Sequence, residues 1–201
     1  MGNTIFRLGG CSACSVEERG MKLSTLIFLL FVFSINTASG FSEENYVALT
    51  LPSTVVGVGS RSTLENGRET ALKVEKILIK DGIKNRKIIT AILVNMWHES
   101  SWIRTAKSGS CVGLFQLHTK YSGRGMTYEE LTNINHHMYR LISLDVYKKW
   151  KSWARNNIEK STCGYMAFRF ASDVERCAVQ HRRPREVTAN RWWKALEPLI
   201  T

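Results

Sequence analysis

Apolar side chains recur at the three- and four-residue spacing of an α-helix over most of the chain after residue 60. Residues 62–65 have the pattern of a capping box before a first helix, which Asp81-Gly82 ends. A second helix is expected from about Asn85, with Glu99 at its carboxyl end. The same spacing predicts helices over 133–153, 164–179 and 188–196, and a helical turn at 128–131.

The helical pattern breaks between residues 104 and 120. Serines and glycines predict a loop at 108–113, and residues 112–117 read as a short extended or turn-like piece. Residues 41–62 have no helical period and predict an irregular arm. The expected fold is therefore one mainly α domain over residues 63–201, with a small loop or hairpin region.

Residues 21–40 have the layout of a secretory signal peptide. Lys22 precedes the apolar run Leu23–Ile35, and small residues follow at Ala38-Ser39-Gly40. The run is shorter than the roughly 20 residues that a membrane-spanning helix needs. The alternatives to a cleaved signal peptide are an uncleaved signal anchor and a buried core helix. We expect a secreted, periplasmic or envelope-associated protein whose synthesis starts at Met21. Residues 1–20 would then be an upstream extension or an artefact, and only an uncleaved segment would contact a membrane.

Composition narrows the class of protein and of partner. The 201 residues are 44% hydrophobic, which argues against intrinsic disorder. The net charge of +11 favours polyanionic partners such as nucleic acid, anionic lipid or a wall polymer. The charge is spread along the chain, with His181-Arg-Arg-Pro-Arg185 as its one local cluster. No specific nucleic-acid site is therefore expected.

Three cysteines follow residue 40, namely Cys111, Cys163 and Cys177. Export would permit one disulfide. A helix over 164–176 would hold Cys163 and Cys177 about 20 Å apart, at about 1.5 Å per residue. The expected bridge therefore joins Cys111 to one of the other two, with three free cysteines as the alternative. No cysteine or histidine spacing predicts a metal site.

The stretch that carries most information about chemistry begins at Glu99. A glutamate that ends a helix beside Trp97 or Trp102 would be desolvated, which disfavours the carboxylate and leaves a proton to donate. The glycines that follow allow close approach of the backbone to a ligand, and Gln116 can hydrogen-bond an amide or hydroxyl of a sugar. By spacing alone, however, a glutamate at a helix end is more often a solvated cap.

Two short motifs carry a resemblance to a known family. Glu99-Ser-Ser-Trp102, followed by Gly113-Leu-Phe-Gln116, resembles the Glu-Ser-x-Trp and Gly-Leu-x-Gln motifs of soluble lytic transglycosylases and goose-type lysozymes, in the lysozyme-like superfamily. The His-Glu-Ser variant is especially similar to cell-wall-degrading proteins of phages and mobile elements. Residues 170–177 are similar to a Phe-Glu-Arg-Pro segment of phage tail muramidases. The resemblance covers about 64–196 and is strongest over 99–116. The late Tyr-Asn-Ala-Gly motif of many transglycosylases is missing.

The resemblance implies roles for individual residues. Glu99 matches the catalytic acid, and Gly113, Leu114 and Gln116 match the loop that lines the sugar cleft. Ser108 lies five residues before Gly113, where the family usually has a serine six before, and Ser108 and Trp102 are further candidate sugar contacts. No metal or organic cofactor is implied.

The implied reaction is cleavage of the β-1,4 bond between N-acetylmuramic acid and N-acetylglucosamine in peptidoglycan. A two-carboxylate hydrolase needs a partner for Glu99 roughly 5–10 Å away, and Glu129, Glu130 and Asp145 are candidates that are each more often solvated helix charges. A single acid fits a lytic transglycosylase better, because the sugar's own 6-hydroxyl replaces water. The alternatives are a non-catalytic glycan-binding or structural virion or envelope component of the same fold, and nucleic-acid binding through the basic surface. Peptidoglycan glycan strands are the expected partner. The sequence does not distinguish a role in a phage virion from a role in cell-envelope machinery.

Overall fold

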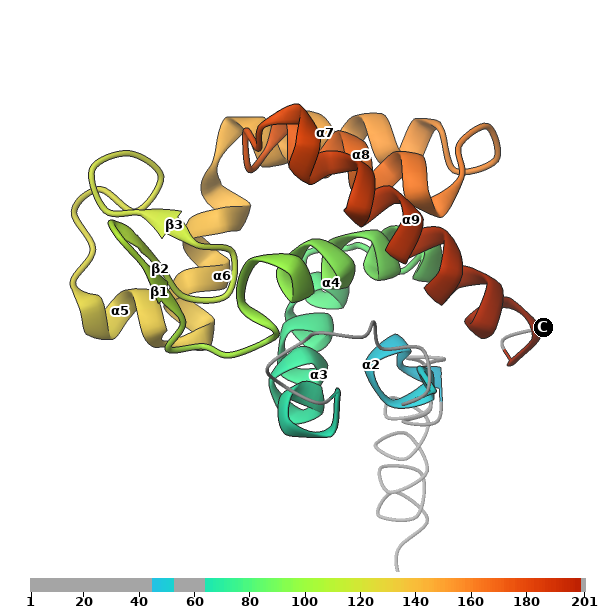
Figure 1. Cartoon of the computed structure of the whole chain (residues 1–201), viewed down its shortest axis with the longest axis horizontal. Helices are drawn as coiled ribbons and strands as arrows, with labels where there is room; N and C mark the ends of the chain where they lie inside the picture. Colours follow the sequence, from blue (N-terminus) through green and yellow to red (C-terminus); the bar gives the residue numbers. More distant parts are fainter. Residues whose placement is uncertain (1–44, 53–63, 200–201) are drawn as a thin grey trace, which may run out of the picture. The chain divides into compact units, whose positions relative to one another are not determined.

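The computed structural model describes residues 45–52 and 64–199, and within them it contains eight α-helices and three short strands (Figure 1). The prediction of a mainly α protein is confirmed. The expected signal segment at 21–40 and the extension at 1–20 lie outside the described residues. Among the described residues, no helix has the length and apolar character needed to cross a bilayer.

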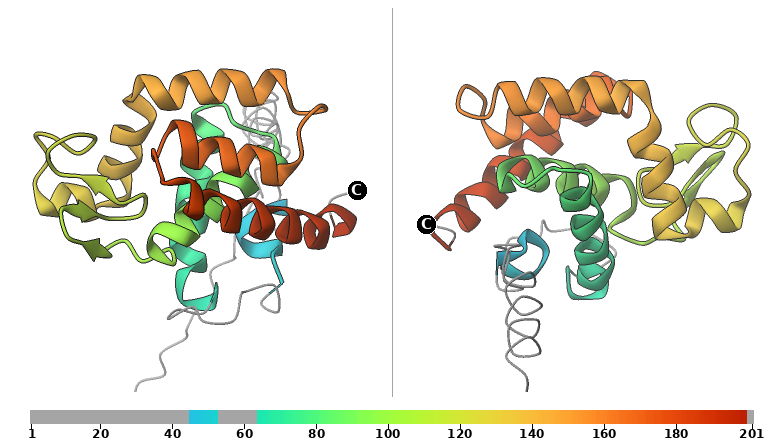
Figure 2. Two further views of the ribbon diagram at one scale, coloured as in Figure 1. Left: turned by 45° about the horizontal axis from the view of Figure 1, so that its top comes forward. Right: turned by 180° about the vertical axis from the view of Figure 1, so that it is seen from behind.

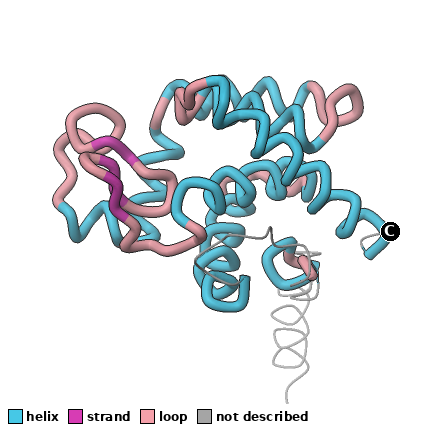
Figure 3. Tube along the Cα trace, viewed as in Figure 1, coloured by secondary structure: helices cyan, strands magenta, loops and turns pink. Residues whose placement is uncertain are grey.

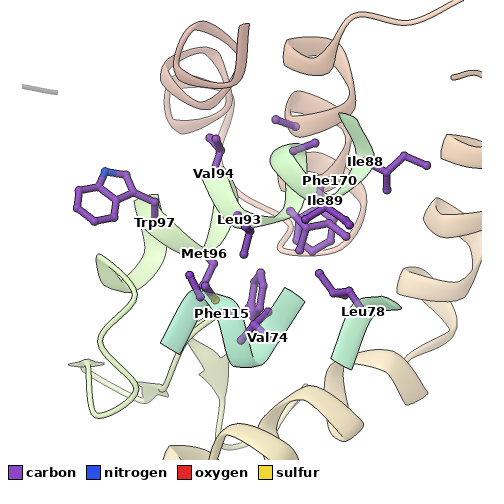
Figure 4. Close-up of a cluster of buried hydrophobic side chains, with 14 of the residues drawn as sticks. Val74, Leu78, Ile88, Ile89, Leu93, Val94, Met96, Trp97, Phe115 and Phe170 are labelled. Carbon is purple, nitrogen blue, oxygen red and sulfur yellow. The ribbon is translucent and has the colours of Figure 1, made fainter. Parts of the chain in front are cut away.

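The core is built around α4 (Arg86–Ser100). Asn85 caps its start, because the Asn85 side chain accepts hydrogen bonds from the backbone N–H groups of Lys87 and Ile88. Every residue from Ile88 to Trp97 is buried, as expected for a helix surrounded by others. It contacts α3 (Leu64–Lys80) and two later helices, and Figure 4 shows the apolar side chains that meet there.

A short helix, α2 (Val47–Thr50), packs on α3 and α4. Side chains of α3 cap both of its ends: Glu75 accepts from Val47 N and Ala48 N, and Arg68 donates to the Ala48 and Leu51 carbonyls. So short a helix is unstable alone, and these caps satisfy its free backbone groups. The prediction of an irregular arm over 41–62 is therefore wrong for α2. This helix contributes to the core, although it lies before the expected domain boundary at 63.

The expected hairpin region is confirmed between α4 and α5 (Tyr128–Thr132). Strands β1 (Lys107–Ser108), β2 (Cys111–Val112) and β3 (Leu117–His118) form an antiparallel sheet, with Ser108 opposite Cys111 and Cys111 opposite His118. In Figure 3 the strands and their loops lie to one side of the large helices.

The long helix predicted over 133–153 is two helices, α6 (Ile134–Ser143) and α7 (Asp145–Asn156). Leu144 between them has an extended backbone, and the chain changes direction there (Figure 1). No glycine or proline marks the break, and both helices bury an apolar face, so the apolar spacing continues across it.

The last two long helices are α8 (Cys163–Asp173) and α9 (Val179–Leu196). They pack against one another and against α4 (Figure 2). The expected bounds, 164–179 and 188–196, were wrong at their facing ends. Helix α8 stops earlier and α9 starts earlier, so residues 174–178 form the connection between them. That connection carries part of the candidate site.

Candidate active site

Glu99 lies in the last turn of α4, immediately before a left-handed stretch of backbone. Ser101 and Trp102 have φ angles of 52° and 62°. This turn sends Trp102 back into the core, where its Nε1 donates to the Leu93 carbonyl at 2.9 Å and its ring packs on Trp97 and Trp192. Trp102 is 1% exposed. The expected sugar contact is therefore not on the surface, and Trp102 instead fixes the turn after Glu99.

Glu99 is paired with Arg185 of α9. Both side chains are largely buried, and the Cys177 thiol lies 3.6 Å from Glu99 Oε1. The sequence predicted that a tryptophan would desolvate this glutamate. The structure instead places a guanidinium against it, so Glu99 has a positive partner that the sequence did not indicate.

A second carboxyl group, Glu175, lies beside this pair. Its Oε2 is 3.4 Å from Arg185 Nε and 3.5 Å from Cys177 Sγ. One oxygen of each carboxyl and the Cys177 sulfur all lie within 4.8 Å of one another. We call Glu99, Glu175, Cys177 and Arg185 the carboxylate cluster.

The cluster holds protons at neutral pH. Burial and the neighbouring charge of Glu99 raise the pKa of Glu175 to about 8. Burial and the charge of Glu175 also raise the pKa of the Cys177 thiol to about 12. Glu175 is therefore an acid with a proton to donate, and its Oε1 is buried without a hydrogen-bond partner among the described residues.

None of the three carboxylates proposed from sequence is this neighbour of Glu99. Glu130 accepts from Thr127 N at 2.8 Å in a capping box, and these hydrogen bonds lower the pKa of Glu130. Glu129 is exposed, and Asp145 pairs with Lys148 at 3.5 Å on the surface. The missed residue was Glu175. The resemblance of residues 170–177 to a Glu-Arg segment was the available signal, but the expected helix over 164–179 gave that glutamate no special position.

A pocket of about 470 Å³ adjoins the cluster, and Glu175 lines it. Its volume is within the range of small-ligand sites. The walls come from the loop after β3, the α6–α7 junction and the α8–α9 connection. The lining residues are His118, Tyr121, Ser122, Leu144, Asp145, Val146, Val174, Glu175 and Arg176.

His137 of α6 connects the Gly113–Gln116 loop to α5 by hydrogen bonds. His137 Nε2 accepts from Phe115 N at 3.1 Å, so Nδ1 is the nitrogen that carries the proton and donates to the Leu131 carbonyl at 2.8 Å. Burial lowers the pKa of His137 to about 4, which keeps the ring neutral. Gly113 has a φ of 82°, and a Cβ there would lie 2.4 Å from the Leu131 oxygen.

The proposed sugar-binding residues are only partly brought to the site. Leu114 is 1% exposed and belongs to the core, as does Phe115 (Figure 4). Gln116 is half-buried, and its Nε2 donates to the Ala106 and Gly113 carbonyls, which braces the loop. The Leu114 side chain is therefore not placed to contact a sugar, and Gly113, which has no side chain, is buried.

Ser108 lies on the sheet, next to a residue whose pKa is affected by Glu99. It is exposed on β1 and pairs with Cys111 of β2. Burial and the charge of Glu99 raise the pKa of Cys111, so β2 lies within electrostatic reach of the cluster. Cys111 of the hairpin is thus close enough to Glu99 at the end of α4 for the charge of Glu99 to act on it.

Backbone strain is concentrated in the segments that carry the site. Among the described residues, the non-glycine residues with positive φ are Ser101, Trp102, Gln116 and Arg176. They lie after Glu99, at the end of the 113–116 loop and directly after Glu175. Such conformations are costly and tend to gather at functional sites.

All three cysteines described by the structure are free, so the expected disulfide from Cys111 is wrong. Cys163 is buried and donates to the Lys87 carbonyl, whereas Cys177 faces the two carboxyls. Glu99, Glu175 and Cys177 are spaced as metal ligands could be. However, Arg185 already supplies a positive charge to both carboxyls, and a cation would have to displace it.

No family of known proteins, no curated protein and no solved structure matches this chain.

Proposed function

We propose that this chain is a peptidoglycan-degrading glycosidase with a lysozyme-like domain, which cleaves the β-1,4 bond between N-acetylmuramic acid and N-acetylglucosamine at the carboxylate cluster. The observation that carries the proposal is the pairing of Glu99 with Glu175, a buried carboxyl that keeps its proton at neutral pH and lines a pocket. The Glu-Ser-x-Trp and Gly-Leu-x-Gln motifs support the same assignment.

Glycoside cleavage begins with a proton on the leaving oxygen. One oxygen of Glu99 and one of Glu175 lie within 4.8 Å of each other, and we assign the transferable proton to this pair, which we call the unit. Arg185 balances the remaining negative charge. We therefore assign the role of general acid to Glu99 and Glu175 together, whereas the sequence predicted Glu99 alone.

The geometry of the pair favours a lytic transglycosylase. In a two-carboxylate hydrolase the carboxyls stand on either side of the sugar bond. Here Arg185 and the Cys177 sulfur contact both carboxyls, so no sugar ring fits between them. The unit would protonate the leaving oxygen as the bond to C1 breaks. It would then take the 6-hydroxyl proton as that oxygen bonds to C1.

The experiment is a cell-wall clearing assay with purified peptidoglycan. Glu99→Gln and Glu175→Gln each keep shape and remove a carboxyl, and we expect both to abolish clearing. Glu130→Gln, which alters a helix cap, serves as the matched control and should clear normally. Near-normal clearing by either cluster variant, with an unchanged circular dichroism spectrum, would reject that residue's role.

One observation favours a second candidate. Arg185 forms an ion pair with the Glu99 carboxylate. A carboxylate engaged in this way is also compatible with a non-catalytic glycan-binding or structural component of a virion or envelope. Such a protein would bind insoluble peptidoglycan without releasing fragments. Sedimentation with peptidoglycan, combined with the clearing assay, separates the two candidates.

A further inference from the structure

A second pocket, of about 590 Å³, lies at the other end of α6 from the first. The first is lined by Leu144 and Asp145, beyond the last residue of α6, and the second by residues 133–135 at its start. A helix of this length spans about 15 Å. We call the second one the basic pocket; its lining residues are Lys73, Lys76, Ile77, Lys80, Arg104, Asn133, Ile134 and Asn135.

Four of these eight residues are cationic and none is acidic. The three lysines occupy positions i, i+3 and i+7 of α3, and therefore share one face of the helix. Like charges at such spacings repel one another. Positive charge is therefore concentrated at this pocket.

Two of these lysines have contacts outside the residues that line the pocket. Lys73 pairs with Glu69, but the two side chains are 56% and 81% exposed, and an exposed pair of this kind neutralises little. Lys76 Nζ lies 5.4 Å from the Tyr46 ring centroid, a cation–π contact.

The opposite wall also presents donors. Arg104 is anchored by a 3.3 Å hydrogen bond from its Nη1 to the Thr132 carbonyl. Asn133 uses its side-chain oxygen to cap α6, accepting from Asn135 N and His136 N, so its amide nitrogen is the end left to donate. Guanidinium, ammonium and amide donors around one hollow are suited to phosphoryl oxygens.

We propose that the basic pocket binds a phosphate-bearing polyanion, with two linked phosphoryl groups seated between α3 and Arg104. Lys73, Lys80 and Arg104 alone call for more than one negative charge. The hollow form fits the phosphates of a flexible chain better than a flat bilayer surface does. This site is separate from the carboxylate cluster and does not depend on the proposed glycosidase activity.

The test uses inorganic pyrophosphate as the probe and the thermal unfolding temperature as the readout. We expect a saturable rise that is larger than with orthophosphate and that weakens as salt increases. Lys73→Gln/Lys80→Gln removes two cationic donors and should weaken pyrophosphate binding by about a hundredfold or more. The control Lys148→Gln/Lys194→Gln removes the same charge from exposed positions on α7 and α9 and should bind normally.

Three results would overturn the proposal. The first is a rise that never saturates, and the second is equal weakening in both double variants, which would mean diffuse attraction to net charge. The third is binding to phosphatidylglycerol vesicles without binding to pyrophosphate, which would mean a membrane surface. Clearing of phosphate-free peptidoglycan should be unchanged in the basic-pocket variant, so failure here and failure of the glycosidase proposal are distinguishable.

Discussion

Arg185 Nε lies 3.4 Å from Glu175 Oε2, while the same guanidinium pairs with Glu99. One positive charge therefore serves two carboxyls in a buried setting. The charge of Arg185 lowers the pKa of Glu175, but burial and the charge of Glu99 raise it more. The group that stays protonated is thus set by the arrangement of four side chains from three parts of the chain.

Removal of Arg185 should expose how much it stabilises the fold. We expect Arg185→Met to lower the free energy of unfolding at pH 7 by about 3–5 kcal/mol, because a buried charge is left without its partner. The loss should be smaller at pH 5, where protons replace the missing cation. Urea unfolding at the two pH values measures both. Arg183→Met is the control, since Arg183 is 74% exposed, and it should change stability little.

The titration of Glu175 should appear in the pH dependence of stability. Its pKa in the folded protein is about 8, above the ordinary value of 4.5, so the folded state binds the proton more tightly than the unfolded state. The wild type should lose this stabilisation as pH rises from about 4.5 through 8, and the loss should level off above the folded pKa. Glu175→Gln does not titrate, so its stability relative to the wild type should rise over that window. A constant difference between pH 5 and pH 8 would contradict the raised pKa.

His137 gives the opposite pH dependence. Its pKa is lowered from 6.5 to about 4, so the unfolded state binds the proton more readily. Its contribution should be complete above pH 6.5 and should fall as pH is lowered toward 4. His137→Ala should lose about 2–4 kcal/mol at pH 7, because Phe115 N loses its acceptor and a cavity forms. It should also lose part of this acid sensitivity, whereas the exposed neighbour His136, changed to Ala, should retain it.

Alanine substitutions at two glycines should distinguish the cost of a left-handed backbone from the cost of a steric clash. Gly113 and Gly125 have φ angles of 82° and 84°, but a Cβ on Gly125 meets nothing within 4 Å. Gly125→Ala should therefore lose only about 1–2 kcal/mol for the left-handed backbone. Gly113→Ala adds the clash with Leu131 and should lose about 3 kcal/mol or more. Equal losses in denaturant unfolding would mean that the 113–116 loop moves freely away from α5.

The sequence predicted the parts of this protein that depend on local pattern. Helix α4, the hairpin region and the position of Glu99 all follow from apolar spacing and from short motifs. The break at Leu144 has no local signal, because both flanking helices present apolar residues to the core. Trp102 was misplaced because its burial depends on Trp192, which lies far along the chain.

The carboxylate cluster could not be predicted from the sequence for a related reason. Glu175 and Arg185 reach Glu99 only because α8 ends at Asp173 and α9 begins at Val179. Those ends were expected several residues away, and a charged residue within a predicted helix is normally solvated. The basic pocket also needed the structure, since Arg104 comes from a different segment than the three lysines.

The last prediction concerns the product. If Glu99 and Glu175 act as one acid–base unit, the digested muropeptides should carry a 1,6-anhydro ring, because the sugar's own 6-hydroxyl replaces water. Mass spectrometry distinguishes this product from the hydrolysed one, which is heavier by one water. Asp145 is the residue to vary alongside, since it lines the same pocket as Glu175 and is exposed. Asp145→Asn should leave the anhydro product unchanged. Reducing-end products that disappear in Asp145→Asn would instead identify a hydrolase in which Asp145 directs the water and the cluster remains the acid.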